Sequence, residues 1–209
     1  MTAVKIKICG ITHPDDALAC IEAGADAIGL NLIPSSPRCV TLDAAREVLR
    51  LVSANAPHLL TVAVIADLST QEMVALQAEF QCLQLHGHED PSQLELLLPH
   101  AYKALRIGTA EDVAAASIYP GEHLLVDAKV PGSLGGTGRV FDWRLVCDLA
   151  RTRKLTLAGG LNVNNISDAI STVRPYAIDV SSGVESAANP RRKDVVRIRD
   201  FVREARASG

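Results

Sequence analysis

The sequence predicts an α/β protein folded as a single (β/α)8 (TIM) barrel, and three observations support this fold class. Eight short apolar runs alternate with longer stretches of helix-like spacing along the 209 residues. Hydrophobic residues make up 48% of the chain but aromatic residues only 3%, so the core must be mainly aliphatic, which suits parallel strands buried on both faces. Eight units leave roughly 26 residues each, close to the minimum for a strand plus a helix in such a barrel.

The strand candidates are rich in β-branched residues and leucine. They are Val4–Cys9, Ala27–Leu32, Leu60–Ile65, Cys82–His86, Tyr102–Ile107, His123–Ala128, Leu155–Ala158 and Ala177–Ser181. Their alternation with helical segments implies parallel strands and right-handed crossovers. An open doubly wound sheet is the alternative, but it usually carries a glycine-rich phosphate fingerprint after its first strand. Cys9 is followed by Gly-Ile-Thr instead, so we expect one closed barrel domain over residues 1–209.

Cap residues predict where several helices begin and end. Ser69, with Glu72 three residues later, has the pattern of a capping box at a helix start. Gly24 suits the left-handed residue that follows a helix. Further helix starts are indicated at Pro14, Pro91, Thr109 and Asn162.

Composition and charge exclude several classes of protein. The net charge of −3 gives no sign of nucleic acid or an anionic membrane as a partner. The most basic stretch, residues 191–206, is interrupted by acidic residues and is expected to be the solvated face of a last helix. Without a long exposed apolar stripe, a monomer is the default expectation.

The cysteines and the N-terminus indicate a cytoplasmic protein. The five cysteines are odd in number and widely spaced, without a C-x-x-C pair, which argues against a disulfide framework or a zinc site. Reduced thiols in the cytosol are the simplest account. The first residues lack the apolar core of a signal peptide, and no apolar run reaches the ~18 residues that span a bilayer.

Functional residues of a closed barrel gather where the strands end and in the loops that follow. Each candidate has a plain structural alternative: a buried thiol, a surface arginine, a packing histidine or a carboxylate in a salt bridge. For His86 the packing role is favoured over a proton shuttle. The candidates at strand ends are Cys9, Arg38, Gln84, His86, Asp127 and Asp179.

Two glycine-containing turns point to a phosphate site. Gly159-Gly160 and Ser182-Gly183 follow the seventh and eighth strands, the usual phosphate-binding loops of this fold. Glycines let backbone N–H groups approach an anion closely, although tight turns alone also explain them. The glycine-rich residues 131–138 are interpreted as a mobile loop over the site.

A set of motifs in fixed order resembles the phosphoribosylanthranilate isomerase family of tryptophan biosynthesis. The motifs fall between residues 5 and 194, so the resemblance covers nearly the whole chain. They are Lys7–Thr12, Gly24–Gly29, Pro34–Arg38, Leu83–Gly87, Val126–Ala128, Gly135–Gly138, Phe141–Trp143, Leu157–Asn162 and Asp179–Glu185.

The resemblance implies an Amadori rearrangement of a phosphorylated sugar–anthranilate, with no cofactor and no metal. By motif match, Cys9 is the general base, Asp127 the general acid and Arg38 the residue that holds the anthranilate carboxylate. The two glycine turns match the phosphate cradle. We expect Asp179 to orient the substrate or tune Cys9, and Gln84 to hydrogen-bond near the reacting centre.

These roles carry expectations about the pKa values of Asp127 and Cys9. Two alternative functions are also considered. Asp127 must be protonated to donate, so its pKa should exceed ~3.9, whereas Cys9 must be a thiolate, so its pKa should fall below ~8.5. Isomerases of histidine synthesis on the same barrel use aspartates after the first and fifth strands, where this chain has Cys9 and Ile107. A catalytically silent phosphate-binding barrel would need neither Cys9 nor Asp127.

Overall fold

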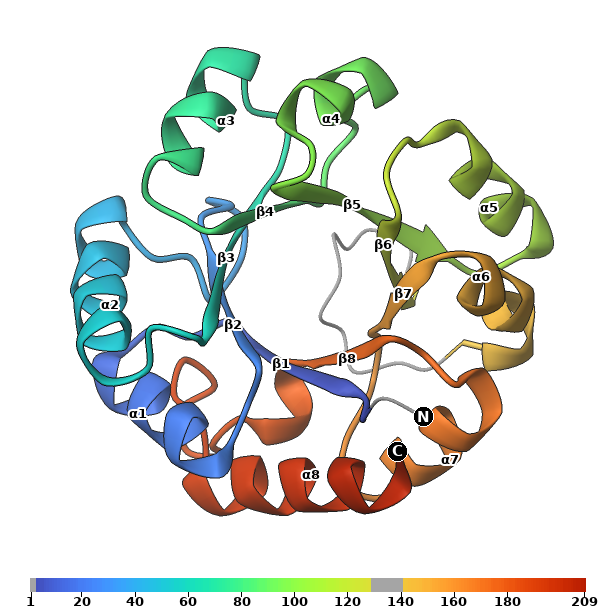
Figure 1. Cartoon of the computed structure of the whole chain (residues 1–209). Coiled ribbons are helices and arrows are strands. Elements are labelled where there is room, and N and C mark those ends of the chain that lie inside the picture. The colour runs from blue at the N-terminus through green and yellow to red at the C-terminus, as the bar shows by residue number, and fades with distance from the viewer. Residues whose placement is uncertain (1–2, 129–140) are drawn as a thin grey trace.

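The computed structural model describes residues 3–128 and 141–209, so the predicted loop at 131–138 lies outside the described residues. Eight parallel strands pair in sequence order, and β1 pairs with β8 to close the barrel (Figure 1). Each predicted strand matches an observed one to within a residue at either end. The strands are β1 Lys5–Cys9, β2 Ala27–Asn31, β3 Leu60–Ile65, β4 Cys82–Leu85, β5 Ala101–Ile107, β6 His123–Ala128, β7 Lys154–Leu157 and β8 Ala177–Val180.

Helices form a ring outside the strands, as Figure 1 shows. None of the described helices is long and apolar enough to cross a bilayer. The α-helices are α1 Pro14–Ala23, α2 Leu42–Asn55, α3 Thr70–Gln77, α4 Pro91–Leu97, α5 Ala110–Ala114, α6 Cys147–Thr152, α7 Ile166–Val173 and α8 Val195–Ser208. Short 3-10 helices are η1 Ala115–Ile118, η2 Trp143–Val146 and η3 Ser182–Val184.

Most of the predicted helix ends are confirmed. Ser69 and Glu72 form the expected capping box, and Thr109 forms a second one with Asp112. Gly24 ends α1 in the left-handed conformation. Pro14 and Pro91 each occupy a first helical position, where no N–H is needed.

The prediction that a helix starts at Asn162 is wrong, because α7 begins at Ile166. The Asn165 side chain accepts the Asn162 N–H at 2.9 Å, and the Asn162 side chain accepts the Asn164 N–H at 2.9 Å. Asparagine side chains compete with the helix for backbone donors in this way. The segment therefore makes a hydrogen-bonded turn before the helix.

The basic stretch near the C-terminus is not one solvated helix face. Asp194 accepts N–H bonds from Val196 and Arg197 and so begins α8. Arg191 and Lys193 precede that helix, and Lys193 is buried at 5% exposure. Lys193 meets Glu185 and Ser181 O, and Arg191 donates to the carbonyls of Pro37 and Cys39, contacts that local sequence does not reveal.

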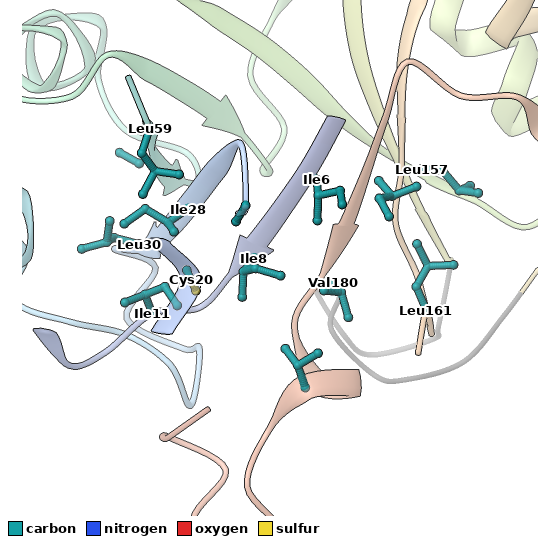
Figure 2. Close-up of a cluster of buried hydrophobic side chains, with 14 of the residues drawn as sticks. Ile6, Ile8, Ile11, Cys20, Ile28, Leu30, Leu59, Leu157, Leu161 and Val180 are labelled. Carbon is teal, nitrogen blue, oxygen red and sulfur yellow. The ribbon is translucent and has the colours of Figure 1, made fainter. Parts of the chain in front are cut away.

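The side chains of β1 point alternately into two environments, the main hydrophobic core and the barrel interior. Ile6 and Ile8 point into the main hydrophobic core, where β1 and β2 contribute neighbouring aliphatic side chains (Figure 2). Because successive strand side chains point to opposite faces, Lys7 and Cys9 point into the barrel. The same strand thus packs the core and supplies polar groups to the interior.

Register fixes what those polar groups meet. Lys7 pairs with Asp179 across the β1–β8 closure, and Cys9 pairs with Gly29 of β2. A second, smaller hydrophobic cluster is separate from the main core. Its members are Val62, Cys82, Tyr102, Ala104, Leu125 and Ala158.

Phe201 on α8 is fully buried in the main core. Phe201→Ala should lower the free energy of unfolding by about 3–5 kcal/mol, since it removes a buried ring and leaves a cavity. Urea denaturation measures this loss. Val196→Ala on the same helix is the control, because Val196 is 63% exposed and should change stability by no more than ~0.5 kcal/mol. Equal losses in the two variants would contradict the packing of α8.

Candidate active site

A cavity of about 390 Å³ opens where the strands end. It brings together nearly every site residue that the sequence predicted, from four strands and from the loops after β2, β7 and β8. Gly183 is the exception, since it lies in η3 directly after the lining. The predicted residues on the wall are Cys9, Arg38, Gln84, Asp127, Gly159, Gly160, Asp179 and Ser182.

A buried polar network forms the floor beside Cys9. The Lys7 ammonium donates to Asp179 Oδ2 at 2.8 Å and to Gln84 Oε1 at 2.9 Å. The Tyr102 hydroxyl also donates to Gln84 Oε1, at 3.1 Å. Lys7 and Asp179 are only 5% and 7% exposed. Since Gln84 Oε1 accepts both bonds, the orientation of its amide is fixed.

The same network determines which ring nitrogen of His86 accepts a hydrogen bond. The Gln84 amide nitrogen can only donate, and it lies 3.0 Å from His86 Nδ1, so Nδ1 is the accepting nitrogen. His86 also lines the cavity. It is therefore an oriented wall residue as well as a hydrogen-bonded packing residue.

Asp179 has one carboxylate oxygen to spare. Oδ2 receives Lys7, whereas no donor among the described residues reaches the buried Oδ1. A buried acceptor without a partner is costly unless a ligand or solvent supplies a donor. Asp179 lines the cavity, so a ligand hydroxyl is a suitable partner for Oδ1.

The acidity of Cys9 differs from the expectation for a thiolate base. Burial raises the pKa of the Cys9 thiol above its ordinary value, and Asp179 raises it further. Lys7 and Lys193 lower it but do not offset the loss of hydration. The expected fall of the pKa below ~8.5 is therefore wrong for the unliganded protein, because the surrounding protein displaces part of the hydration of a thiolate even though Cys9 is partly exposed to the cavity.

Asp127 lies on the same cavity wall as Gly159. It is buried, and its Oδ1 accepts the Ala128 N–H at 2.8 Å. Gly159 has a φ of 92°, and a Cβ there would lie 2.6 Å from Ala128 N and 3.0 Å from Asp127 Oδ1. Only glycine fits that conformation and that approach, so Gly159 allows the β7 turn to close over Asp127.

Arg38 is held in place rather than being a free surface arginine. Its Nε donates to Glu185, and the two side chains are 13% and 11% exposed. Lys193 Nζ lies 3.5 Å from the same Glu185 oxygen and donates to Ser181 O at 3.1 Å. Within the described residues no hydrogen bond engages Arg38 Nη1 or Nη2. These terminal nitrogens form a fork suited to a carboxylate.

The backbone of the Arg38 loop is held as well. Arg191 donates to Pro37 O at 2.6 Å and to Cys39 O at 3.0 Å, on either side of Arg38. Two bonds from one planar guanidinium restrict both the position and the direction of the loop.

Comparison with known proteins decides the family. Residues 6–204 match the family model described as N-(5'-phosphoribosyl)anthranilate (PRA) isomerase. The chain belongs to this isomerase family. The described part of the chain contains no group of three or more His, Cys, Asp or Glu side chains placed to hold a metal ion.

Individual relatives agree with the family match. A PRA isomerase of Stutzerimonas stutzeri is 44% identical over 211 residues, covering 99% of both chains. The structure of the phosphoribosylanthranilate isomerase of Thermotoga maritima superposes with a TM-score of 0.86 at 33% identity, covering 98% of this chain and 99% of that one. A second solved structure contains phosphoribosyl anthranilate isomerase in complex with reduced 1-(o-carboxyphenylamino)-1-deoxyribulose 5-phosphate. Its TM-score is 0.83 at 32% identity, covering 98% of this chain and 99% of that one.

Sequence reasoning gave no role to three residues that hold the wall of this cavity from behind: Lys7, Glu185 and Lys193. Lys7 carries a signal that could have found it, since it lies two residues before Cys9 and so faces the same side of the strand. Glu185 and Lys193 carry none, because they meet through a local antiparallel bridge. Such contacts are not encoded in local spacing.

The raised pKa of Cys9 predicts that its thiol is alkylated slowly at neutral pH. Without ligand, alkylation of Cys9 by iodoacetamide should reach half its maximal rate at a higher pH than for N-acetylcysteine amide, since only the thiolate reacts. Peptide mass analysis of each time point separates Cys9 from the other cysteines. A midpoint below that of the small thiol would contradict the dominance of burial.

Proposed function

We propose that this chain converts N-(5-phosphoribosyl)anthranilate to 1-(2-carboxyphenylamino)-1-deoxyribulose 5-phosphate in L-tryptophan biosynthesis. The observation that carries the proposal is that Cys9, Asp127, Arg38 and the β7 and β8 turns line one cavity. Family membership supports it. The ligand in the second solved relative is a reduced compound of the same type as this product.

Each of the two anionic groups of the substrate, the phosphate and the carboxylate, has a set of hydrogen-bond donors on one wall of the cavity. The phosphate is assigned to the turns at Gly159-Gly160 and Ser182-Gly183, where backbone N–H groups can surround an anion. Because α7 begins only at Ile166, the turn itself, more than that helix, supplies these donors. The carboxylate is assigned to the Arg38 fork. Fixing both ends holds the sugar between Cys9 and Asp127, which lowers the entropic part of the barrier.

The reaction then needs two proton transfers. Protonated Asp127 gives its proton to the furanose ring oxygen as the C1–O bond breaks, and the nitrogen lone pair forms a protonated Schiff base. The Cys9 thiolate removes the proton from C2, the C–H electrons form a C1–C2 double bond, and the C=N electrons return to nitrogen. The resulting enol loses its hydroxyl proton and gains a proton at C1. Every electron pair is kept, so the reaction needs no external oxidant or reductant.

The pKa of Asp127 above ~3.9 remains a prediction of this mechanism. It follows from the need for a proton donor at neutral pH. The Cys9 thiolate must form despite a raised pKa. A thiolate that forms less readily is a stronger base once it is present, which suits removal of a carbon-bound proton.

Cys9→Ala and Asp127→Asn should each lower kcat by about 10²–10⁴-fold, the range for a general acid or base. Steady-state turnover of purified variants measures the loss, and circular dichroism checks the fold. Cys147→Ala is the matched control, since Cys147 lies on the outer helix α6 and should leave turnover unchanged. Near-normal turnover in either site variant would remove that residue from its role.

Arg38→Ala should raise KM more than it lowers kcat, because the carboxylate loses its paired donors. Arg38→Lys should recover only part of the affinity, since lysine offers a point charge in place of a fork. Arg46→Ala is the control, because that arginine pairs with Asp43 and Glu79 on the outer surface. Unchanged KM and kcat in Arg38→Ala would exclude Arg38 from substrate binding.

Complementation tests the activity as a whole. A tryptophan auxotroph lacking this isomerase should grow without tryptophan when it expresses the chain. The Cys9→Ala variant in the same strain is the negative control. No growth with well-expressed wild-type protein would favour a silent phosphate-binding barrel.

A further inference from the structure

Lys7 is a buried charged residue that the proposed mechanism leaves without a role. It lies two residues before Cys9 on β1, so the two side chains leave the strand on the same face. The β1–β8 register places Asp179 beside Lys7, and the β1–β2 register places Gly29 beside Cys9. The lysine and the thiol therefore share one corner of the barrel interior.

Gly29 shows how close the two side chains are. A Cβ at Gly29 would lie 2.7 Å from Cys9 Sγ and 3.1 Å from Lys7 Cε. Both side chains thus occupy the space that the missing Cβ leaves open. The thiol and the end of the lysine stem lie side by side over the backbone of β2.

The lysine is held as a cation. Burial opposes its charge, but Asp179, Cys9 and Tyr102 together outweigh burial and keep the pKa of Lys7 well above its ordinary value. The bonds to Asp179 Oδ2 and Gln84 Oε1, at 2.8 and 2.9 Å, leave the ammonium little freedom to move. Lys7 therefore presents a fixed positive charge over the whole pH range of catalysis.

We propose that Lys7 is a positioning residue for Cys9: its ammonium, fixed by Asp179 and Gln84, provides the positive charge that the Cys9 thiolate faces. The relevance to turnover rests on the proposed role of Cys9 as the base. Lys7 itself exchanges no proton with the substrate. It acts by making the thiolate less costly to form and by holding the sulfur against Gly29.

The charges around Cys9 determine in which direction each neighbour shifts the pKa of its thiol. Lys7 and Lys193 favour the thiolate, whereas Asp179 disfavours it. The Tyr102 hydroxyl, from β5, stays protonated because burial raises its pKa far above the working range. Glu185 partly neutralises Lys193, which lies 3.5 Å from it. Gly29 of β2 and Gln84 of β4 add no charge. Lys7 and Asp179 should therefore shift Cys9 in opposite directions.

Lys7→Met removes the charge and keeps most of the length of the side chain. The pH midpoint for alkylation of Cys9 by iodoacetamide should rise by about 1 unit or more, the usual size of the effect of an opposite charge at close range. The acid limb of the kcat/KM profile should move up by a similar amount. Activity lost at neutral pH should therefore recover in part at high pH.

Asp179→Asn makes the opposite prediction and does not depend on the folding of Lys7→Met. It removes the negative charge, but Gln84 still accepts from Lys7, and the Cys9 thiolate replaces Asp179 as the counter-ion that keeps Lys7 charged. The Cys9 midpoint should therefore fall below that of the wild type. A purely structural role for the pair would not produce shifts of opposite sign.

Lys103→Met is the matched control. Lys103 is also buried on a barrel strand and also pairs with a buried carboxylate, since its Nζ lies 2.6 Å from Glu89. It is not among the charges that act on Cys9. Its loss should weaken the fold but leave the Cys9 midpoint unchanged.

The inference is overturned if Asp179→Asn leaves the midpoint at its wild-type pH or raises it, or if folded Lys7→Met leaves it unshifted. Alkylation reports the thiol and not turnover, so it separates this inference from the proposed function. Normal turnover in Cys9→Ala would refute the base role, while opposite shifts in the two variants would still support the link between Lys7 and Cys9.

Discussion

Closure of the barrel by the pairing of β1 with β8 is the constraint on which the rest of the structure depends. It brings residues from the two ends of the chain into register, and Lys7 meets Asp179 there. Two opposite charges are tolerated in the interior because each satisfies the other and Gln84 accepts a further bond. The closure also sets Cys9 beside Gly29, where the thiol has room.

Burial has two opposing effects on the Cys9 thiol. It strengthens each electrostatic interaction, so that Lys7, Asp179 and Lys193 all act on one thiol. It also removes water from a thiolate, which raises the pKa of Cys9. A base in such a position is formed less often but is stronger when formed. The fixed charges around it determine how far this balance favours the thiolate.

The Arg38 side of the cavity depends on a segment far away in sequence. Glu185 and Lys193 meet across a short antiparallel bridge after β8, and Glu185 also binds Arg38. Arg191, from the same segment, holds the carbonyls on both sides of Arg38. The loop after β2 is therefore positioned by the segment before α8. A proline-stiffened loop alone would not fix the direction of the guanidinium.

The sequence by itself determined the eight strands, most helix ends and the strand-end residues that gather in the cavity, because short apolar runs, cap chemistry and the ordered motifs are local. It did not predict the turn at Asn162, where side chains compete for backbone donors, or the burial of Lys193. Only the tertiary structure decided the acidity of Cys9 and the partners of Lys7 and Arg38. Those depend on desolvation and on contacts between residues more than a hundred positions apart, such as Lys7 with Asp179 and Arg38 with Glu185.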